Sequence, residues 1–339
     1  MQKEVVIFTK DPAASWRMIC DEGPYLNGTD LAPFPLGFFA AGQMFALLAE
    51  LLAAAEEAGV SLDRLALTQT NRYTMTGSFL RGDATGGALP PEIIIRAGGP
   101  SSAGAVAELV RRTVDASPSL ALMRAAPESG FSLRHNERAV LLCGLQAPPT
   151  DTPDPAVVFM DLRPVDAHAI PDIIVKTQAA PIAQGVAGGA GSSLQAIQNR
   201  TLHIAGEAAW LGAGQLQCDV GLVQPIGSSF RFRCDTTGRE APGPLEYLAA
   251  GIGFCFMTQL GRYAHIRKLR LTSYRLNQES AFGPALRIAT HTWLESEESD
   301  EVAADILRTG ERTCFLHAAL RAVLWPAIQL EFNDTPVAF

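Results

Sequence analysis

The chain has 339 residues and a formal net charge of −8, and 47% of its residues are hydrophobic while 18% are charged. Its length exceeds that of one ordinary core and predicts about two domains, and its apolar content argues against extensive disorder. The 35 acidic residues outnumber the 27 basic ones, so no electrostatic footprint for nucleic acid or an anionic membrane is expected.

The N-terminal segment and the longest apolar run indicate a cytoplasmic protein without a membrane partner. Residues 1–10 read as a short strand and lack the long apolar core of a signal peptide. The run from Phe38 to Ala55 approaches the length of a membrane span, but Gln43 and Glu50 interrupt it. We therefore expect Phe38 to Ala55 to be a buried helix of a soluble protein.

Taken in chain order, the predicted elements occur twice, which indicates an internal duplication. Each copy has a strand, a helix that begins with proline, two further strands, a second helix and a closing strand. In the first copy we expect strands at 1–10 and 15–21, a helix from Pro35 to a cap at Gly59, strands at 62–68 and 91–96, a helix from Ala105 to Arg124 and a strand at 131–136. In the second copy we expect strands at 201–210, 215–222 and 229–235, a helix from Pro244 to Leu260, strands at 266–272 and 285–293, a helix from Glu301 to Leu324 and a strand at 328–333.

The duplication predicts two domains, at residues 1–140 (the first half) and 200–339 (the second half). Residues 141–199 are predicted to be a connector, because they are rich in proline and contain a glycine-rich stretch at 185–193. Within this connector, residues 156–162 and 173–176 have strand-like composition and are expected to pair as a hairpin.

Cysteine spacing excludes the common structural uses of this residue. The six cysteines, at 20, 143, 218, 234, 255 and 314, include no Cys-x-x-Cys pair, so neither a zinc knuckle nor a disulfide framework is expected.

Cys255 and Cys314 lie at interior positions of the two helices of the second half. A free cysteine in apolar surroundings is by default a small buried hydrophobe. A reactive thiolate needs a cation or a helix N-terminus nearby, because an apolar environment disfavours the charged form.

Basic side chains that can supply such a cation are present, although the sequence does not show which ones are close. They are Arg239, Arg262, Arg312 and His317. Cys314 and His317 lie on one helical face and are also potential metal ligands. Two ligands without a third and a fourth do not make a metal site, so no metal and no cofactor is expected.

Two motifs resemble those of the osmotically inducible and organic hydroperoxide resistance proteins, the OsmC/Ohr family. The stretch Pro244-Leu-Glu-Tyr-Leu-Ala-Ala-Gly-Ile-Gly-Phe-Cys255 resembles the helix Pro-Glu-x-Leu-x-Ala-Ala-Gly-x-x-x-Cys of that family. Cys314-Phe-Leu-His317 is similar to its second motif, Cys-Pro-Val-His. The resemblance covers residues 200–339. It implies an α+β fold with central long helices wrapped by bent antiparallel sheets, and a thiol peroxidase that uses a small-molecule hydroperoxide and a dithiol reductant.

The resemblance also implies roles for individual residues. Cys255 is the peroxidatic thiol, which attacks the hydroperoxide, and Cys314 is the resolving thiol. Leu245 stands where many members of the family have a glutamate, so Glu246 is the candidate carboxylate. Arg239 is the candidate activating arginine, and Arg200 is a second choice.

The first half departs further from the family, because Ala46 aligns with Cys255 and Ser117 aligns with Cys314. We therefore expect two OsmC-like repeats that form an intramolecular pseudo-dimer, with one active site per chain and further homo-oligomerisation left open. The alternative is a non-catalytic or repurposed protein of the same fold that binds a small apolar ligand between its helices.

Overall fold

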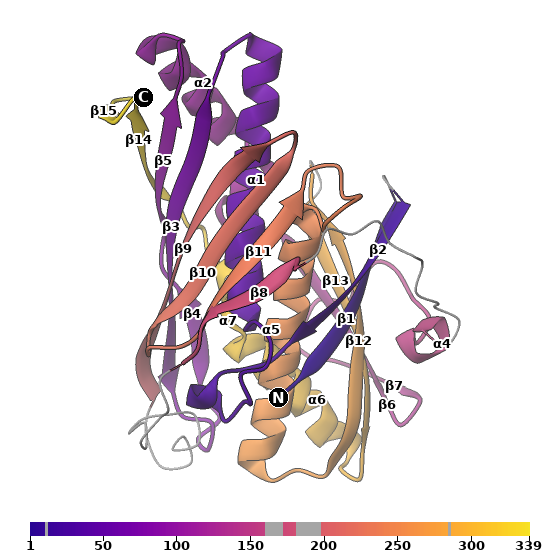
Figure 1. The fold of residues 1–339 in the computed structure, drawn as a ribbon. Coiled ribbons are helices and arrows are strands. Elements are labelled where there is room, and N and C mark those ends of the chain that lie inside the picture. Colours follow the sequence, from indigo (N-terminus) through magenta and orange to yellow (C-terminus); the bar gives the residue numbers. More distant parts are fainter. Residues whose placement is uncertain (11–12, 160–171, 181–197, 284–285) are drawn as a thin grey trace.

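The computed structural model describes residues 1–10, 13–159, 172–180, 198–283 and 286–339, and it shows a mixed α+β protein (Figure 1). The first half consists of β1 (Lys3–Lys10), β2 (Ala13–Cys20), the 3-10 turn η1 (Pro24–Leu26), α1 (Pro35–Ala58), β3 (Arg64–Gly77), β4 (Thr85–Ala88), β5 (Glu92–Gly98), α2 (Ala103–Ala116), α3 (Pro118–Arg124), β6 (Glu128–His135) and β7 (Arg138–Val140). After α4 (Pro155–Phe159) and β8 (Ile174–Gln178), the second half consists of β9 (Gln198–Gly212), β10 (Gln215–Gln224), β11 (Ser229–Asp235), α5 (Pro244–Arg267), β12 (Leu271–Ala281), β13 (Arg287–Ser296), α6 (Asp300–Thr313), α7 (Phe315–Arg321), β14 (Ala327–Phe332) and β15 (Thr335–Val337).

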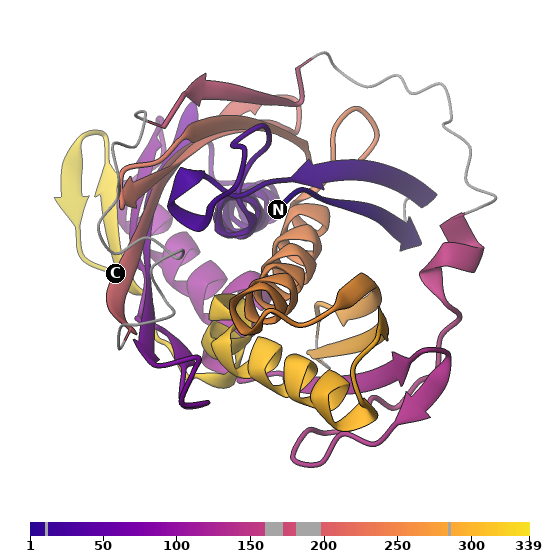
Figure 2. The ribbon, with the colours of Figure 1, turned by 90° about the horizontal axis from the view of Figure 1, so that it is seen from below.

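The two long helices, α1 and α5, pack against each other in the interior (Figures 1 and 2). Each has 24 residues and begins with a proline at its first turn, where the missing N–H group has no helical partner. A glycine on each helix permits the close approach. A Cβ atom on Gly42 would lie 2.6 Å from the backbone nitrogen of Leu248, and one on Gly251 would lie 2.7 Å from that of Phe39. The two contacts are reciprocal, because each glycine faces the backbone of the other helix.

Helix α1 is apolar and largely buried. It ends at Gly59, whose φ of 66° is the left-handed conformation that glycine adopts readily, and this confirms the predicted cap. Among the described helices, α1 is the only one long and apolar enough to cross a membrane, but 72% of its most apolar window is buried inside the protein. It packs against β3, β9 and β10 as well as against α5.

The strands of the described residues form a nine-stranded, a four-stranded and a two-stranded sheet, and the two larger sheets combine both halves. The nine-stranded sheet has the order β15-β14-β5-β3-β9-β10-β11-β8, with β4 paired to β3, and the four-stranded sheet has the order β12-β13-β6-β7. The closing strand of each half pairs with the other half: β6 runs parallel to β13, and β14 runs parallel to β5. The halves therefore exchange their last strands.

The structure corrects three predicted elements outside the connector. The helix expected from Ala105 to Arg124 is two helices, since Pro118 disfavours helical geometry at Ser117, which instead caps α3. The helix expected from Glu301 to Leu324 is likewise broken, at Cys314. The strand expected at 266–272 begins only at Leu271, because α5 continues to Arg267.

The hairpin expected in the connector is wrong in its described part. Pro155–Phe159 forms the short helix α4, and Ile174–Gln178 (β8) pairs with β11 instead. The rest of its first strand, at 160–162, and the glycine-rich stretch at 185–193 lie outside the described residues.

A candidate thiol site between the two halves

Helix α5 and the break between α6 and α7 bring two thiols together in the core. Cys255 lies in the middle of α5 and is 2% exposed. Cys314 has an extended backbone, with φ −69° and ψ 121°, and it forms the N-cap of α7. Its side chain is fully buried. Both thiols belong to the same buried core, and each acts on the pKa of the other.

The surroundings of the two thiols differ. Burial raises the pKa of Cys255 well above its usual value, and the hydrogen bond and charge of Cys314 raise it further. Burial also acts to raise the pKa of Cys314, but the hydrogen bond from Cys255 and the neighbouring His317 outweigh it and hold this pKa well below its usual value. The Nδ1 atom of His317 lies 3.2 Å from the Cys314 sulfur. The arrangement therefore favours one thiolate, shared within the pair and centred on Cys314.

This shared thiolate predicts two separate titration steps. We expect one proton of the pair to leave well below the usual cysteine pKa, and the second well above it, because the first thiolate accepts a hydrogen bond from the remaining thiol. The ultraviolet thiolate absorbance of the wild type, minus that of a Cys255→Ser/Cys314→Ser variant, measures these steps. His317→Gln is expected to raise the pKa of the first step, so that less thiolate is present at neutral pH. Two steps near the ordinary cysteine pKa contradict the prediction.

Aromatic rings from both halves hold His317 in place. Its ring centroid lies 5.1 Å from that of Phe256 on α5 and 5.2 Å from that of Phe131 on β6. Its Nε2 atom is buried and has no hydrogen-bond partner among the described residues. The parallel pairing of β6 with β13 thus brings a first-half ring to the thiol pair.

A buried carboxylate reaches the site from the first half. Glu22 follows β2 and is 2% exposed. The hydroxyl groups of Thr258 and Tyr25 donate hydrogen bonds to it, at 2.9 Å and 3.0 Å. Burial raises the pKa of Glu22, and its charge in turn acts to raise the pKa of Cys255. Sequence reasoning missed this group, although a signal was present: the repeat aligns Glu22 with Thr236, so the acid is specific to the first half.

Two arginines, Arg262 and Arg200, belong to the same group of interacting side chains as Glu22 and Tyr25. Arg262, on α5, is 4% exposed, and its guanidinium carbon lies 4.7 Å from the centroid of the Phe79 ring. Burial lowers the pKa of Arg262 to about 9, and the positive charge of Arg200 contributes. Arg200, near the start of β9, also has a pKa lowered by burial. Among the described residues, no hydrogen-bond partner is present for the three guanidinium nitrogens of Arg262, nor for Nε and Nη2 of Arg200.

Two other sequence candidates, Glu246 and Arg239, lie in the first turn of α5 and in the loop before it. The carboxylate of Glu246 lies beside Gly243 at the N-terminus of α5, where the N–H groups of Gly243 and Glu246 act to lower its pKa while burial raises it. Glu246 lies nine residues before Cys255, which is about 13 Å along a helix axis. Arg239 is exposed in the loop before α5, and its N–H group donates to Asp235. The roles predicted for Glu246 and Arg239 beside Cys255 stay predictions.

The equivalent position in the first half has a related geometry without a thiol. Ser117 is the N-cap of α3, as Cys314 is of α7. Its hydroxyl donates to Glu50 at 2.5 Å. Ala46, which aligns with Cys255, is an ordinary core residue that is 4% exposed. The helix break is therefore a feature of both halves, while the thiol pair occurs in one.

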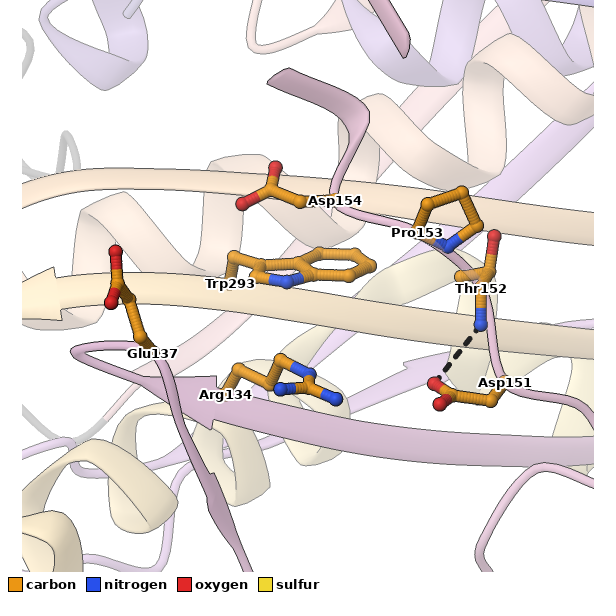
Figure 3. Close-up of a pocket in the computed structure, with 7 residues that line it drawn as sticks. All are labelled: Arg134, Glu137, Asp151, Thr152, Pro153, Asp154 and Trp293. Atoms are coloured by element: carbon orange, nitrogen blue, oxygen red, sulfur yellow. Dashed lines mark hydrogen bonds between the residues drawn. The ribbon is translucent and has the colours of Figure 1, made fainter. Parts of the chain in front are cut away.

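A separate surface pocket lies on the outer side of the four-stranded sheet. Figure 3 shows Trp293 and Arg134, from the neighbouring strands β13 and β6, beside the loop from Asp151 to Asp154. The pocket has a volume of about 550 Å³ and contains no cysteine. Among the described residues, no cluster of three or more histidine, cysteine or acidic side chains is arranged to hold a metal ion.

Comparison with known protein families supports the assignment of the thiol segment. The family model for OsmC-like proteins matches residues 236–326, which include α5, both thiols and His317. No match was found among curated proteins. Glu22, Tyr25 and Arg200 lie outside the matched segment, so these contributions to the site come from other parts of the chain.

Proposed function

Because the second half of this chain carries an OsmC-like domain, we propose that the protein is a thiol-dependent peroxidase that reduces organic hydroperoxides with Cys255 and Cys314. The proposal is supported by two buried thiols inside the matched segment, Cys255 on α5 and Cys314 at the α6–α7 break, each of which acts on the pKa of the other. The fold alone is not enough to assign a reaction, whereas two thiols in contact with one low pKa match a specific chemistry.

The proposed reaction has two steps on the protein. A thiolate attacks the terminal oxygen of R–O–OH, the O–O bond breaks, and the alkoxide leaves and takes up a proton to become an alcohol. The attacking cysteine becomes a sulfenic acid. The second thiol then attacks that sulfur and expels the hydroxyl group as water, which gives a Cys255–Cys314 disulfide. A dithiol reductant restores both thiols and is itself oxidised to a disulfide.

The family resemblance makes Cys255 the attacking thiol and Cys314 the resolving one. The lowered pKa of Cys314 indicates that the resting charge lies on Cys314, and proton exchange across the hydrogen bond makes the thiolate of Cys255 accessible from that state. Both orders of attack lead to the same disulfide, so the attacking residue is a separate question for experiment.

We also propose that the two halves form an intramolecular pseudo-dimer in a cytoplasmic protein, with the sheets wrapped around α1 and α5. The reciprocal contacts of Gly42 and Gly251 and the exchange of β6 and β14 support this arrangement. In this view the first half serves as scaffold and as the source of Glu22, and one active site is present per chain.

Consumption of an alkyl hydroperoxide in the presence of a dithiol reductant tests the proposed activity. We expect turnover, and we expect mass spectrometry after treatment with one equivalent of hydroperoxide to show the Cys255–Cys314 disulfide. A wild-type protein that neither consumes hydroperoxide nor forms this disulfide is not a peroxidase.

The second candidate is a binding protein for a small apolar ligand, and the burial that raises the pKa of Cys255 favours it. Thiol titration separates the two functions. A binding protein requires no thiolate at neutral pH and no disulfide after peroxide treatment, whereas the peroxidase requires both.

A further inference from the structure

We propose that Arg262 and Arg200 form a subsite for a carboxylate, which positions an anionic hydroperoxide with its peroxide group at the thiol pair. The part of this inference that concerns the substrate rests on the proposed peroxidase function. The carboxylate site itself does not, because it depends on the arginines and not on the thiols.

Arg262 is a buried cation without a polar partner. All three of its guanidinium nitrogens are buried and without a hydrogen-bond acceptor among the described residues, and the group packs against the face of Phe79. The charges of Tyr25 and Glu22 favour its cationic form without forming a hydrogen bond to it. Five N–H groups in this position cannot all be satisfied by an aromatic ring. Buried charges in proteins are normally paired, and the described residues offer Arg262 no such partner, so its position suits a bound anion.

Arg200 adds a second positive charge that acts on Arg262, and its side chain is partly exposed to solvent. It is opposite Met75 in the pairing of β9 with β3, and it is partly exposed while its Nε and Nη2 atoms are buried and unpaired. The charge of Arg200 disfavours that of Arg262, and an anion bound between them offsets this repulsion.

The nearby carboxylate of Glu22 does not fill this role. Its hydrogen bonds come from Thr258 and Tyr25, and neither arginine forms an ion pair with any acidic residue in the described part of the chain. A guanidinium group donates two parallel hydrogen bonds to a carboxylate, so a planar oxyanion of this kind fits two adjacent, unpaired guanidinium groups.

The position of the arginines relative to the thiols sets the shape of the substrate. Arg262 lies seven residues after Cys255 on the same helix, which is about 10 Å along the axis. Tyr25 links the two sites electrostatically, since the charges of both Arg200 and Cys255 act on its pKa. The subsite therefore selects a hydroperoxide whose carboxylate is separated from the peroxide group by an apolar chain of about that length.

Binding of octanoate to a Cys255→Ser/Cys314→Ser variant tests the subsite without any peroxidase chemistry. We expect calorimetry to detect octanoate and not octanol, and we expect Arg262→Gln and Arg200→Gln, each added to this variant, to weaken octanoate binding by about tenfold to a hundredfold. Arg231→Gln, which removes an exposed salt bridge with Asp219, is the matched control and should leave binding unchanged.

Arg262→Met is expected to melt at a higher temperature than the wild type in the absence of ligand, because it removes an unpaired buried charge.

A second measurement addresses the substrate. We expect the wild type to have a higher kcat/KM for a hydroperoxide of octanoic acid than for that of its methyl ester, and Arg200→Gln to lower this ratio by about tenfold or more. Octanoate binding that requires both arginines, together with a protein that reduces no hydroperoxide, supports the subsite and rejects the peroxidase. Hydroperoxide reduction with equal rates for acid and ester, together with octanoate binding that is absent or insensitive to both arginines, overturns the subsite and leaves the peroxidase intact.

Discussion

Cys255→Ser is expected to lower steady-state hydroperoxide reduction by at least about a thousandfold, because it removes one of the two sulfurs that the catalytic disulfide requires. Cys314→Ser is expected to have a similar effect with a dithiol reductant, since the sulfenic acid then has no partner within the chain. The measurement is the initial rate of hydroperoxide consumption at a fixed reductant concentration. Cys143→Ser, at an exposed position, is the control and should retain the wild-type rate.

The same variants identify the attacking thiol. Treatment with one equivalent of hydroperoxide and a sulfenic-acid trap should label Cys255 in Cys314→Ser if the order implied by the family applies. Labelling of Cys314 in Cys255→Ser reverses that order, in agreement with the hydrogen bonds that lower the pKa of Cys314. Full activity of either variant excludes the two-cysteine mechanism.

Gly251→Ala is expected to destabilise the folded protein by about 1–3 kcal/mol, because the new methyl group lies in the crossing of α1 and α5. Its Cβ atom would approach the backbone nitrogen of Phe39 to 2.7 Å, and a helix backbone cannot move aside as a side chain can. Gly42→Ala should have a comparable effect, through its 2.6 Å approach to the nitrogen of Leu248. Chemical denaturation followed by circular dichroism measures both changes in the free energy of unfolding.

Gly104→Ala is the matched control for these substitutions. It is also a helical glycine, but it is exposed on α2, and an added Cβ atom would meet nothing within 4 Å. Alanine there is expected to stabilise the protein by about 0.5–1 kcal/mol, since it reduces the conformational freedom of the unfolded chain. If Gly251→Ala and Gly104→Ala have the same effect, the close helix crossing is absent.

The sequence determined most of the local structure of this protein. Proline at the first turn and glycine after the last turn delimit α1. The duplicated order of elements predicted both long helices and most of the strands, although α5 and β3 continue to Arg267 and Gly77, beyond their predicted ends. The pair of Cys255 and Cys314 was also identified from sequence, by their motifs and by the absence of cysteine at Ala46 and Ser117. These features are encoded locally, in residue type and in short-range spacing.

Only the tertiary structure decided what surrounds the thiols. Glu246 has the right residue type and approximate spacing, but α5 holds it about two and a half turns away from Cys255 at the helix N-terminus. Glu22 and Arg200 are distant from Cys255 in sequence, and the packing of the first half and of β9 around α5 brings them into the same buried cluster. The exchange of strands between halves, β6 to β13 and β14 to β5, has no sequence signal, because strand pairing depends on which chain segments meet in space.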